Sequence, residues 1–252
     1  MTIISNEEKE ERAIKNAVEI HNLRKVYKIG EQKVIALNDV SLNINAGEIC
    51  CILGTSGSGK STLLNLIAGL EKPSRGSILI NGKRIEQMDE NQLSLFRQKH
   101  IGFIFQSFNL LPAFSALENV SLPLAFRGMK KPERDRLAAS ILKSVGLKKH
   151  LKHKPSEMSG GQQQRVGIAR AFVSSPPIIL ADEPTGNLDS KTSLEVMQLM
   201  MGLARDNQQT LIIVTHDSNI ARFADQVVYF LDGNIEEIKF NYPEMEENIN
   251  EA

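Results

Sequence analysis

The chain has 252 residues, in which 30 Lys and Arg balance 30 Asp and Glu. This length can bury one sizeable core with an inserted subdomain, and the neutral charge gives no electrostatic reason to expect nucleic acid as a partner. No apolar run approaches the ~20 residues that cross a bilayer, and the charged start lacks the apolar core of a signal peptide. We expect a cytoplasmic protein whose membrane role, if any, comes through another polypeptide.

The first part of the chain predicts a charged arm and then a small β subdomain. Residues 1–16 are dense in Glu and Lys and are interpreted as a solvated arm. Between Val18 and Ile44 the pattern is strand-like, because apolar side chains such as Val40 alternate with polar ones. A further short strand is expected over 77–80.

A glycine-rich stretch between an apolar run and a helical pattern is the strongest signal in the chain. It follows 49–53, a run of the length of a buried strand, and precedes 63–68, a helical pattern. Strand, glycine-rich turn and helix form the context that a phosphate-binding loop requires. The stretch consists of Gly54, Thr55, Ser56, Gly57, Ser58, Gly59, Lys60, Ser61 and Thr62.

The residue types of this loop suit a nucleoside triphosphate. Glycine has no Cβ, so Gly54, Gly57 and Gly59 let backbone amides approach a phosphate closely. The helix that starts near Lys60 adds unpaired N–H groups and the positive end of its dipole. We expect Lys60 to reach the β- and γ-phosphates and the Ser61 hydroxyl to ligate Mg²⁺. A glycine-rich connection with a chance Lys-Ser pair would not explain the flanking strand and helix.

The two cysteines, Cys50 and Cys51, are adjacent within the apolar run. Successive side chains of a strand point to opposite faces, so we interpret them as small buried residues rather than a disulfide or a metal pair. That usage fits a reducing compartment.

The middle of the chain predicts a strand followed by a helical insertion. Residues 101–105 form the next apolar run. Ser115 and Glu118 have the spacing of a capping box, which marks a helix start, and 133–145 predicts a second amphipathic helix. Two or three helices without an intervening strand indicate a helical subdomain at about 107–174.

Strand and helix patterns then alternate towards the end of the chain. Apolar runs at 178–182, 211–215 and 227–230 predict buried strands, and 191–206 predicts a helix. This alternation favours an α/β fold with a mostly parallel sheet. The apolar stripe of that helix is expected to consist of Leu194, Met197, Leu199, Met200 and Leu203. Residues 239–252 are interpreted as an acidic tail.

Four residues that can carry chemistry lie directly after predicted strands: Gly54, Gln106, Asp182 and His216. Ligands of parallel sheets bind at the carboxyl ends of the strands, so we expect these residues to converge. Asp182 would hold Mg²⁺, and Glu183 would accept a proton from, or orient, the water that attacks the γ-phosphate. An Asp-Glu pair in isolation would favour a solvated loop; the preceding strand and the phosphate loop favour catalysis.

A second glycine-rich element precedes a helix expected over 163–173. It consists of Ser159, Gly160, Gly161 and Gln162. Ser159 suits an N-cap, and a helix N-terminus is an anion site, although such an element alone is more often an ordinary cap. The histidines outside these motifs show no ligand spacing and are expected at the surface: His21, His100, His150 and His153.

Taken together, these motifs resemble the nucleotide-binding domain of ATP-binding cassette (ABC) transporters. The likeness runs from about Val18 to Glu236, and six separate motifs occur in family order. It implies an ABC ATPase domain over 17–238, with a P-loop core of mostly parallel sheet, a small antiparallel β subdomain and an inserted helical subdomain. ATP and Mg²⁺ are the implied cofactors.

The resemblance also implies roles that the residue pattern alone does not assign. Tyr27 would stack on adenine, and Gln106 would contact Mg²⁺ or the attacking water and report to the transmembrane partner. Asp189 would belong to the D-loop, which contributes to the nucleotide site. The implied catalytic set is Glu183, His216, Gln106 and Lys60, and the implied metal ligands are Ser61, Gln106 and Asp182.

In this family the signature, here Ser159 to Gln162, completes the ATP site of a second subunit. The resemblance therefore implies a homodimer that closes head to tail around two ATP molecules. It further implies a separate multi-spanning permease, contacted through 107–130, and a position on the inner face of the cell membrane. Met158 stands where the signature usually has Leu, and Thr55 where the loop often has Pro; neither change indicates a degenerate site.

Three stretches, 108–112, 118–124 and 184–189, are similar to one subgroup of the family. It contains the ATPases of lipoprotein release, of macrolide and antimicrobial-peptide export, and of a cell-division complex. We therefore hypothesise the ATPase subunit of an exporter or extractor, with a cell-division ATPase that moves no cargo as the alternative. A soluble cassette acting on DNA or ribosomes is disfavoured, because the chain has one cassette, no sustained heptads and no excess positive charge.

Overall fold

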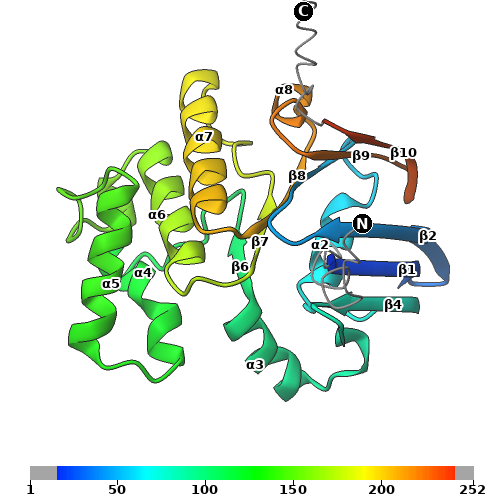
Figure 1. Ribbon diagram of the computed structural model, residues 1–252, viewed down its shortest axis with the longest axis horizontal. Helices are drawn as coiled ribbons and strands as arrows, with labels where there is room; N and C mark the ends of the chain where they lie inside the picture. The colour runs from blue at the N-terminus through cyan, green and yellow to red at the C-terminus, as the bar shows by residue number, and fades with distance from the viewer. Residues whose placement is uncertain (1–15, 242–252) are drawn as a thin grey trace, which may run out of the picture.

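The computed structural model describes residues 16–241 and contains two sheets and a separate group of helices (Figure 1). The expected charged arm, apart from residue 16, and the tail beyond residue 241 lie outside the described residues. Within the described residues, no helix is both long and apolar enough to cross a membrane.

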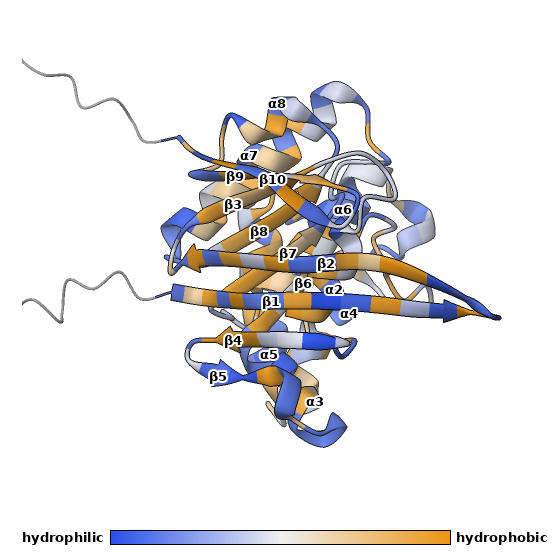
Figure 2. Ribbon diagram, turned by 90° about the vertical axis from the view of Figure 1, so that its right-hand side faces the viewer, coloured by the Kyte–Doolittle hydropathy of each residue, from blue (hydrophilic) through white to orange (hydrophobic). Residues whose placement is uncertain are grey.

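The smaller sheet is antiparallel. Its first two strands, β1 and β2, are each 14 residues long, where the sequence predicts shorter runs. Its order is β2-β1-β4-β5. The strands are β1 (Asn16–Ile29), β2 (Gln32–Asn45), β4 (Arg75–Ile80) and β5 (Lys83–Arg84). Irregularities on either side of Leu23 let β1 and β2 stay paired where the alternation breaks. Figure 2 shows this sheet across the front of the molecule.

The larger sheet has the order β10-β9-β3-β8-β7-β6, and all of its strands except β10 run parallel. They are β3 (Ile49–Leu53), β6 (Ile101–Ile104), β7 (Ile178–Asp182), β8 (Thr210–Thr215), β9 (Gln226–Leu231) and β10 (Asn234–Phe240). The sequence did not predict β10, which follows a tight turn at Asp232 and Gly233. This strand ends at Phe240, two residues beyond the predicted end of the ATPase domain at residue 238.

The central strand β3 is buried on both faces, which explains its unbroken apolar sequence. Cys50 packs into the core beside α2 (Lys60–Ile67), and Cys51 packs into the core beside α7 (Ser190–Asp206). Both thiols are free and buried, as the strand alternation predicts. Burial raises the pKa of Cys51 to about 12.

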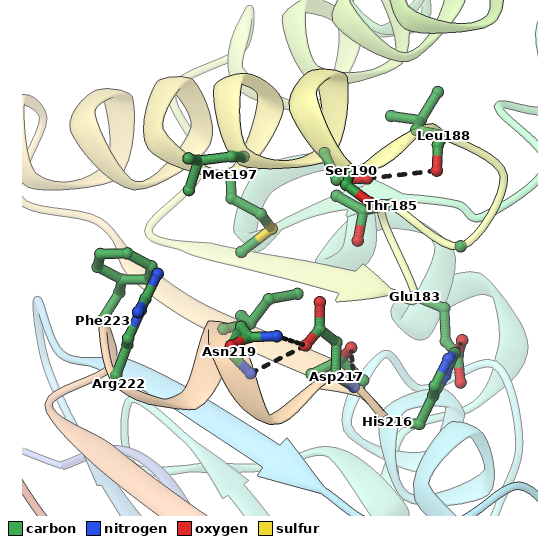
Figure 3. A pocket seen from close by; sticks show the side chains of 15 residues that line it. Glu183, Thr185, Leu188, Ser190, Met197, His216, Asp217, Asn219, Arg222 and Phe223 are labelled. Atoms are coloured by element: carbon green, nitrogen blue, oxygen red, sulfur yellow. Dashed lines mark hydrogen bonds and ion pairs between the residues drawn. The ribbon is translucent and has the colours of Figure 1, made fainter.

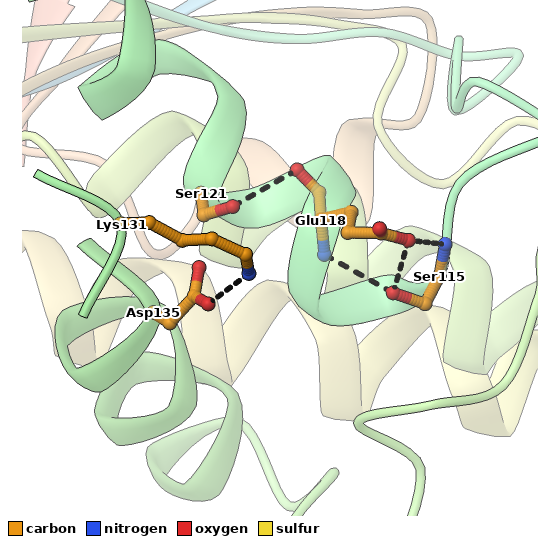
Figure 4. A network of polar contacts seen from close by, with 5 residues as sticks. All are labelled: Ser115, Glu118, Ser121, Lys131 and Asp135. Carbon is orange, nitrogen blue, oxygen red and sulfur yellow. Dashed lines mark hydrogen bonds and ion pairs between the residues drawn. The ribbon is translucent and has the colours of Figure 1, made fainter. Parts of the chain in front are cut away.

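The helical subdomain has a small core of its own and lies to the side of the larger sheet (Figure 1). It contains α4 (Ala116–Phe126), α5 (Lys131–Ser144) and α6 (Gly160–Phe172). The capping box at Ser115 forms as predicted, and an ion pair joins Lys131 to Asp135 at 2.5 Å (Figure 4). The shorter helices elsewhere are α3 (Glu90–His100), α8 (Ser218–Ala221), η1 (Ile85–Gln87) and η2 (Pro155–Glu157).

The buried face of α7 differs from the predicted stripe. Leu194 is 43% exposed, whereas the buried residues are Val196, Met197, Met200, Met201 and Ala204. The predicted Leu203 is only partly buried, because α7 packs against the sheet core and the helical core at once. A helix with two apolar neighbours does not have the single stripe that periodicity assumes.

Replacement of Met200 by Ala should therefore destabilise the protein by about 2–5 kcal/mol, because this fully buried side chain would leave a cavity. Leu194→Ala, on the exposed side of the same helix, should change stability by about 0.5 kcal/mol or less. Urea denaturation of both variants measures the difference. Equal losses would contradict the observed orientation of α7.

Candidate functional site

The phosphate loop after β3 requires glycine at two positions for steric reasons. A Cβ on Gly54 would lie 2.1 Å from the carbonyl oxygen of Phe230, and one on Gly59 would lie 2.3 Å from that of Ala36. Gly59 also has a φ of 102°, a conformation that side chains disfavour. The loop is thus held against the backbones of β2 and β9. Consecutive backbone amides in such a glycine-rich turn suit an anion such as phosphate.

Lys60 begins α2 and is almost buried, at 4% exposure. Its Nζ donates to the carbonyl oxygen of Thr55 at 2.6 Å and to Ser58 Oγ at 3.3 Å. Burial lowers the pKa of Lys60, and the carboxylates of Glu183 and Asp182 oppose that shift. The loop therefore holds the ammonium group against its own backbone and the Ser58 hydroxyl.

Ser61 and Asp182 meet although they lie 121 residues apart. Ser61 Oγ donates to Asp182 Oδ1 at 2.9 Å, across the ends of α2 and β7. Burial raises the pKa of Asp182, with a smaller contribution from Glu183, whereas Ser61 and Lys60 oppose the shift. A hydroxyl and a carboxylate are hard oxygen donors, so this pair fits a magnesium ion bound beside a triphosphate.

Glu183 follows β7 directly, and its carboxylate Oε2 lies 2.8 Å from Nδ1 of His216 at the end of β8 (Figure 3). Glu183 has a φ of 43°, which is uncommon outside glycine. Its N–H donates to the carbonyl of Val214 at 2.9 Å, so the neighbouring strand holds this turn. The carboxylate faces the phosphate-loop side of the sheet edge, where Glu183 also acts on the pKa of Lys60.

Gln106 comes from the end of β6 and lies against the turn that follows Glu183. A Cβ on Gly186 would be 2.6 Å from Gln106 Nε2, and Asn187 Nδ2 donates to the Gln106 carbonyl at 3.0 Å. The N–H of Gly54 donates to the carbonyl of Thr215, next to His216, at 3.3 Å. The structure thus brings together the strand-end residues that the sequence singles out.

Tyr27 lies on β1, and its hydroxyl donates to Glu71 Oε2 at 2.7 Å. Lys25 also pairs with that oxygen, at 2.9 Å, and its Nζ is 4.9 Å from the centre of the Tyr27 ring. Burial, together with Glu71, raises the pKa of Tyr27, whereas a contact with Thr62 lowers it. Tyr27 is thus held close to the helix that starts at the phosphate loop.

The second glycine-rich element forms the N-terminus of α6. Ser159 Oγ accepts from the N–H of Gln162 at 3.3 Å, and Gln162 Oε1 accepts from the N–H of Ser159 at 3.0 Å. A Cβ on Gly161 would lie 2.6 Å from Thr192 Cγ2 of α7, whose N-cap is Asp189. None of the hydrogen bonds or ion pairs within residues 16–241 joins this element to the phosphate loop.

Comparison with known proteins identifies the family. The sequence model of the ABC transporter family matches residues 37–186. The chain belongs to this family. The ABC transporter ATP-binding protein MJ0796 of Methanocaldococcus jannaschii, itself uncharacterised, is 48% identical over 223 residues, which cover 87% of this chain and 95% of the relative. The ABC transporter ATP-binding protein YtrE of Bacillus subtilis is 51% identical over 203 residues, or 81% and 88% of the two chains.

Two further matches concern a fused protein and a solved structure. The macrolide export ATP-binding/permease protein MacB 1 of Yersinia pestis is 46% identical over 218 residues, which are 86% of this chain but 33% of MacB. A dimeric structure of MJ0796 in a post-hydrolysis state with ADP and Pi superposes with a TM-score of 0.84 at 46% identity, and covers 90% of this chain and 99% of that one. These matches confirm three expectations: the ABC ATPase fold, the assignment of the chain as an ATP-binding subunit of an ABC transporter, and its ATPase activity.

Three of the four histidines expected at the surface of this ABC ATPase are half-buried instead: His100, whose ring stacks on Phe96 with centroids 4.6 Å apart, and His150 and His153 beside the signature element. The rings of His150 and His153 are 4.9 Å apart, and His150 Nε2 lies 3.3 Å from Gln162 Nε2. A cavity of about 400 Å³ between α7 and α8 was likewise not predicted; Glu183, His216 and Met197 are among its lining residues (Figure 3). Both features arise from tertiary packing, which sequence spacing does not encode.

Asp182→Asn should raise the melting temperature of the ligand-free protein at about pH 8. The folded-state pKa of Asp182 lies above its usual value, so ionising this carboxyl costs stability once the pH is above both values. The gain should therefore disappear as the pH falls to the usual pKa of an aspartic acid, about 4. Thermal melts with Asp232→Asn, a matched change on an exposed turn, provide the control. An Asp182→Asn protein that melts below wild type at pH 8 would contradict this.

Proposed function

We propose that this chain hydrolyses ATP as one half of a head-to-tail homodimer and drives a separate permease that exports or extracts a lipoprotein, peptide or hydrophobic drug. The observation that carries the proposal is the separation of two anion-binding elements, the phosphate loop and the signature element, within one chain. A second copy placed head to tail would bring the signature element of one chain to the phosphate loop of the other. The dimeric form of MJ0796, a relative of nearly equal length, supports that arrangement.

Within one copy, different residues of the site have different roles in ATP hydrolysis. The amides of Gly54 to Thr62 and the ammonium of Lys60 would bind the phosphates, while Ser61, Asp182 and Gln106 would hold Mg²⁺. When bound, Mg²⁺ neutralises charge on the phosphates. Glu183 orients the attacking water and accepts its proton, and the contact with His216 fixes the direction of that carboxylate.

The remaining residues of the site contact the adenine base or the ATP held by the partner subunit. The ring of Tyr27 lies in the β subdomain close to α2, which supports stacking on adenine. Ser159 to Gln162 form the N-terminus of α6, and a helix N-terminus suits the γ-phosphate of ATP on the partner subunit. Asp189 caps α7 beside that element, which supports a place at the same interface.

The permease would contact the helical subdomain through 107–130. This region exposes Leu111 at 43%, Phe114 at 36% and Phe126 at 66%. Beside Phe126 lies a cavity of about 220 Å³ that Phe105 and Arg170 also line. Exposed apolar groups around a cleft are typical of protein docking sites, and MacB, which joins both functions in one name, supports a permease partner. Such a partner would hold this chain at the inner face of the cell membrane.

Glu183→Gln should retain ATP binding but lose hydrolysis by about a hundredfold or more, because the water loses its base. The stalled protein should then accumulate as a dimer in Mg-ATP, which size-exclusion chromatography with light scattering detects. Adding Lys60→Ala to the same protein should restore the monomer. A Glu183→Gln protein that hydrolyses ATP normally, or stays monomeric in Mg-ATP, would overturn the proposed site.

Phe126→Ser should reduce recovery of the permease about tenfold when the tagged chain is purified from membranes in mild detergent, with basal ATPase activity unchanged. Leu95→Ser is the matched control, because Leu95 is also exposed, at 57%, but lies on α3 outside the proposed contact. Equal recovery with both variants would place the contact elsewhere.

A further inference from the structure

Gln164 is a completely buried polar residue on the signature helix, α6, which begins at the signature element and packs beside the hydrolysis site. It lies on α6, five residues after Ser159, and its exposure is 0%. Its Nε2 donates to the carbonyl oxygen of Pro184 at 2.5 Å and, over a longer 3.5 Å, to that of Phe105. Pro184 follows Glu183 in sequence, and Phe105 precedes Gln106, so one amide group touches both strand-end turns.

The orientation of this amide is fixed by the groups around it. Both neighbours are carbonyl oxygens, which only accept hydrogen bonds, so the NH₂ end of Gln164 must face them. Its Oε1 is buried without a hydrogen-bond partner. A buried unpaired oxygen is unfavourable, so packing alone would favour an apolar side chain of similar size at this position. The presence of Gln164 is therefore explained by the hydrogen bonds that its NH₂ group donates to the two carbonyls.

The turn after Glu183 needs such external support. Glu183 has a positive φ of 43°, and strained backbone of this kind persists only where its surroundings hold it. On the sheet side, the Glu183 N–H donates to Val214; within the turn, Gly186 N–H donates to the Glu183 carbonyl at 3.0 Å. On the helical side, α6 supports the turn through the hydrogen bond that Gln164 donates to the carbonyl of Pro184.

We propose that Gln164 is a positioning residue that keeps the turns of Glu183 and Gln106 aligned with the signature helix. Engagement of Ser159 to Gln162 by nucleotide on the partner subunit then aligns the hydrolytic turn of this chain. The inference rests on the roles proposed above for Glu183, Gln106 and the signature element. It assigns Gln164 no contact with ATP.

Gln164→Leu removes the donor and keeps the bulk, and Gln209→Leu is its matched control. Gln209 is also buried, at 5% exposure, donates from Nε2 to the carbonyl of Pro176 at 2.5 Å, and has an unpaired Oε1. It precedes β8, at the opposite ends of the strands. Both variants should lower the melting temperature by about 5 °C. Only Gln164→Leu should lower kcat, by about 10- to 100-fold, with ATP affinity within about twofold.

A second variant separates positioning from packing by its pH profile. In Gln164→Glu, burial raises the pKa of the new carboxyl, and its protonated form can donate to the Pro184 carbonyl again. Its kcat relative to wild type should therefore rise as pH falls from about 8 to about 6. A constant ratio, or equal kcat for Gln164→Leu and Gln209→Leu, would overturn the inference.

Failure of this inference can be told apart from failure of the proposed function. If Glu183→Gln abolishes hydrolysis and traps the dimer, the proposed site holds. Equal kcat values for the two Leu variants would then refute only the role of Gln164. If Glu183→Gln hydrolyses ATP normally, the proposed site fails whatever the Gln164 variants do.

Discussion

The parallel register of the central strands is the constraint on which the rest of the site depends. β3 pairs with β8 so that Leu53 lies beside Thr215, and β7 pairs with β8 so that Asp182 lies beside Val214. Each strand therefore ends at the same edge of the sheet. The phosphate loop, the carboxylates and His216 come from three distant parts of the chain, yet short side chains are enough to join them.

This edge concentrates charge in a partly buried place, and the protein accepts an electrostatic cost for it. Burial lowers the pKa of Lys60 and raises the pKa of Asp182, so both charged forms are disfavoured in the ligand-free protein. A triphosphate with a divalent cation supplies an opposite charge to each group. Nucleotide binding and folding stability are therefore linked, and part of the binding free energy offsets a penalty already present.

Features that depend on near neighbours in sequence could be predicted, and features that depend on tertiary packing could not. The capping box at Ser115 and the N-cap at Ser159 need partners only three residues away, and both form. The partner of Tyr27 could not be found, because Glu71 lies 44 residues further along the chain. The buried face of α7 was predicted wrongly at Leu194, because the helix packs on two cores and periodicity assumes one.

In a head-to-tail pair, coupling between the two ATP sites depends on which structural elements connect them. The signature element of one copy would meet the nucleotide held by the other, whereas Glu183 and Gln106 of that same copy serve its own nucleotide. A route between the two must therefore run from α6 to the strand ends within one chain. The amide of Gln164 spans that gap in a single side chain, since α6 carries it and both turns accept from it. Occupation of one site would then favour hydrolysis at the other without any contact between the two nucleotides.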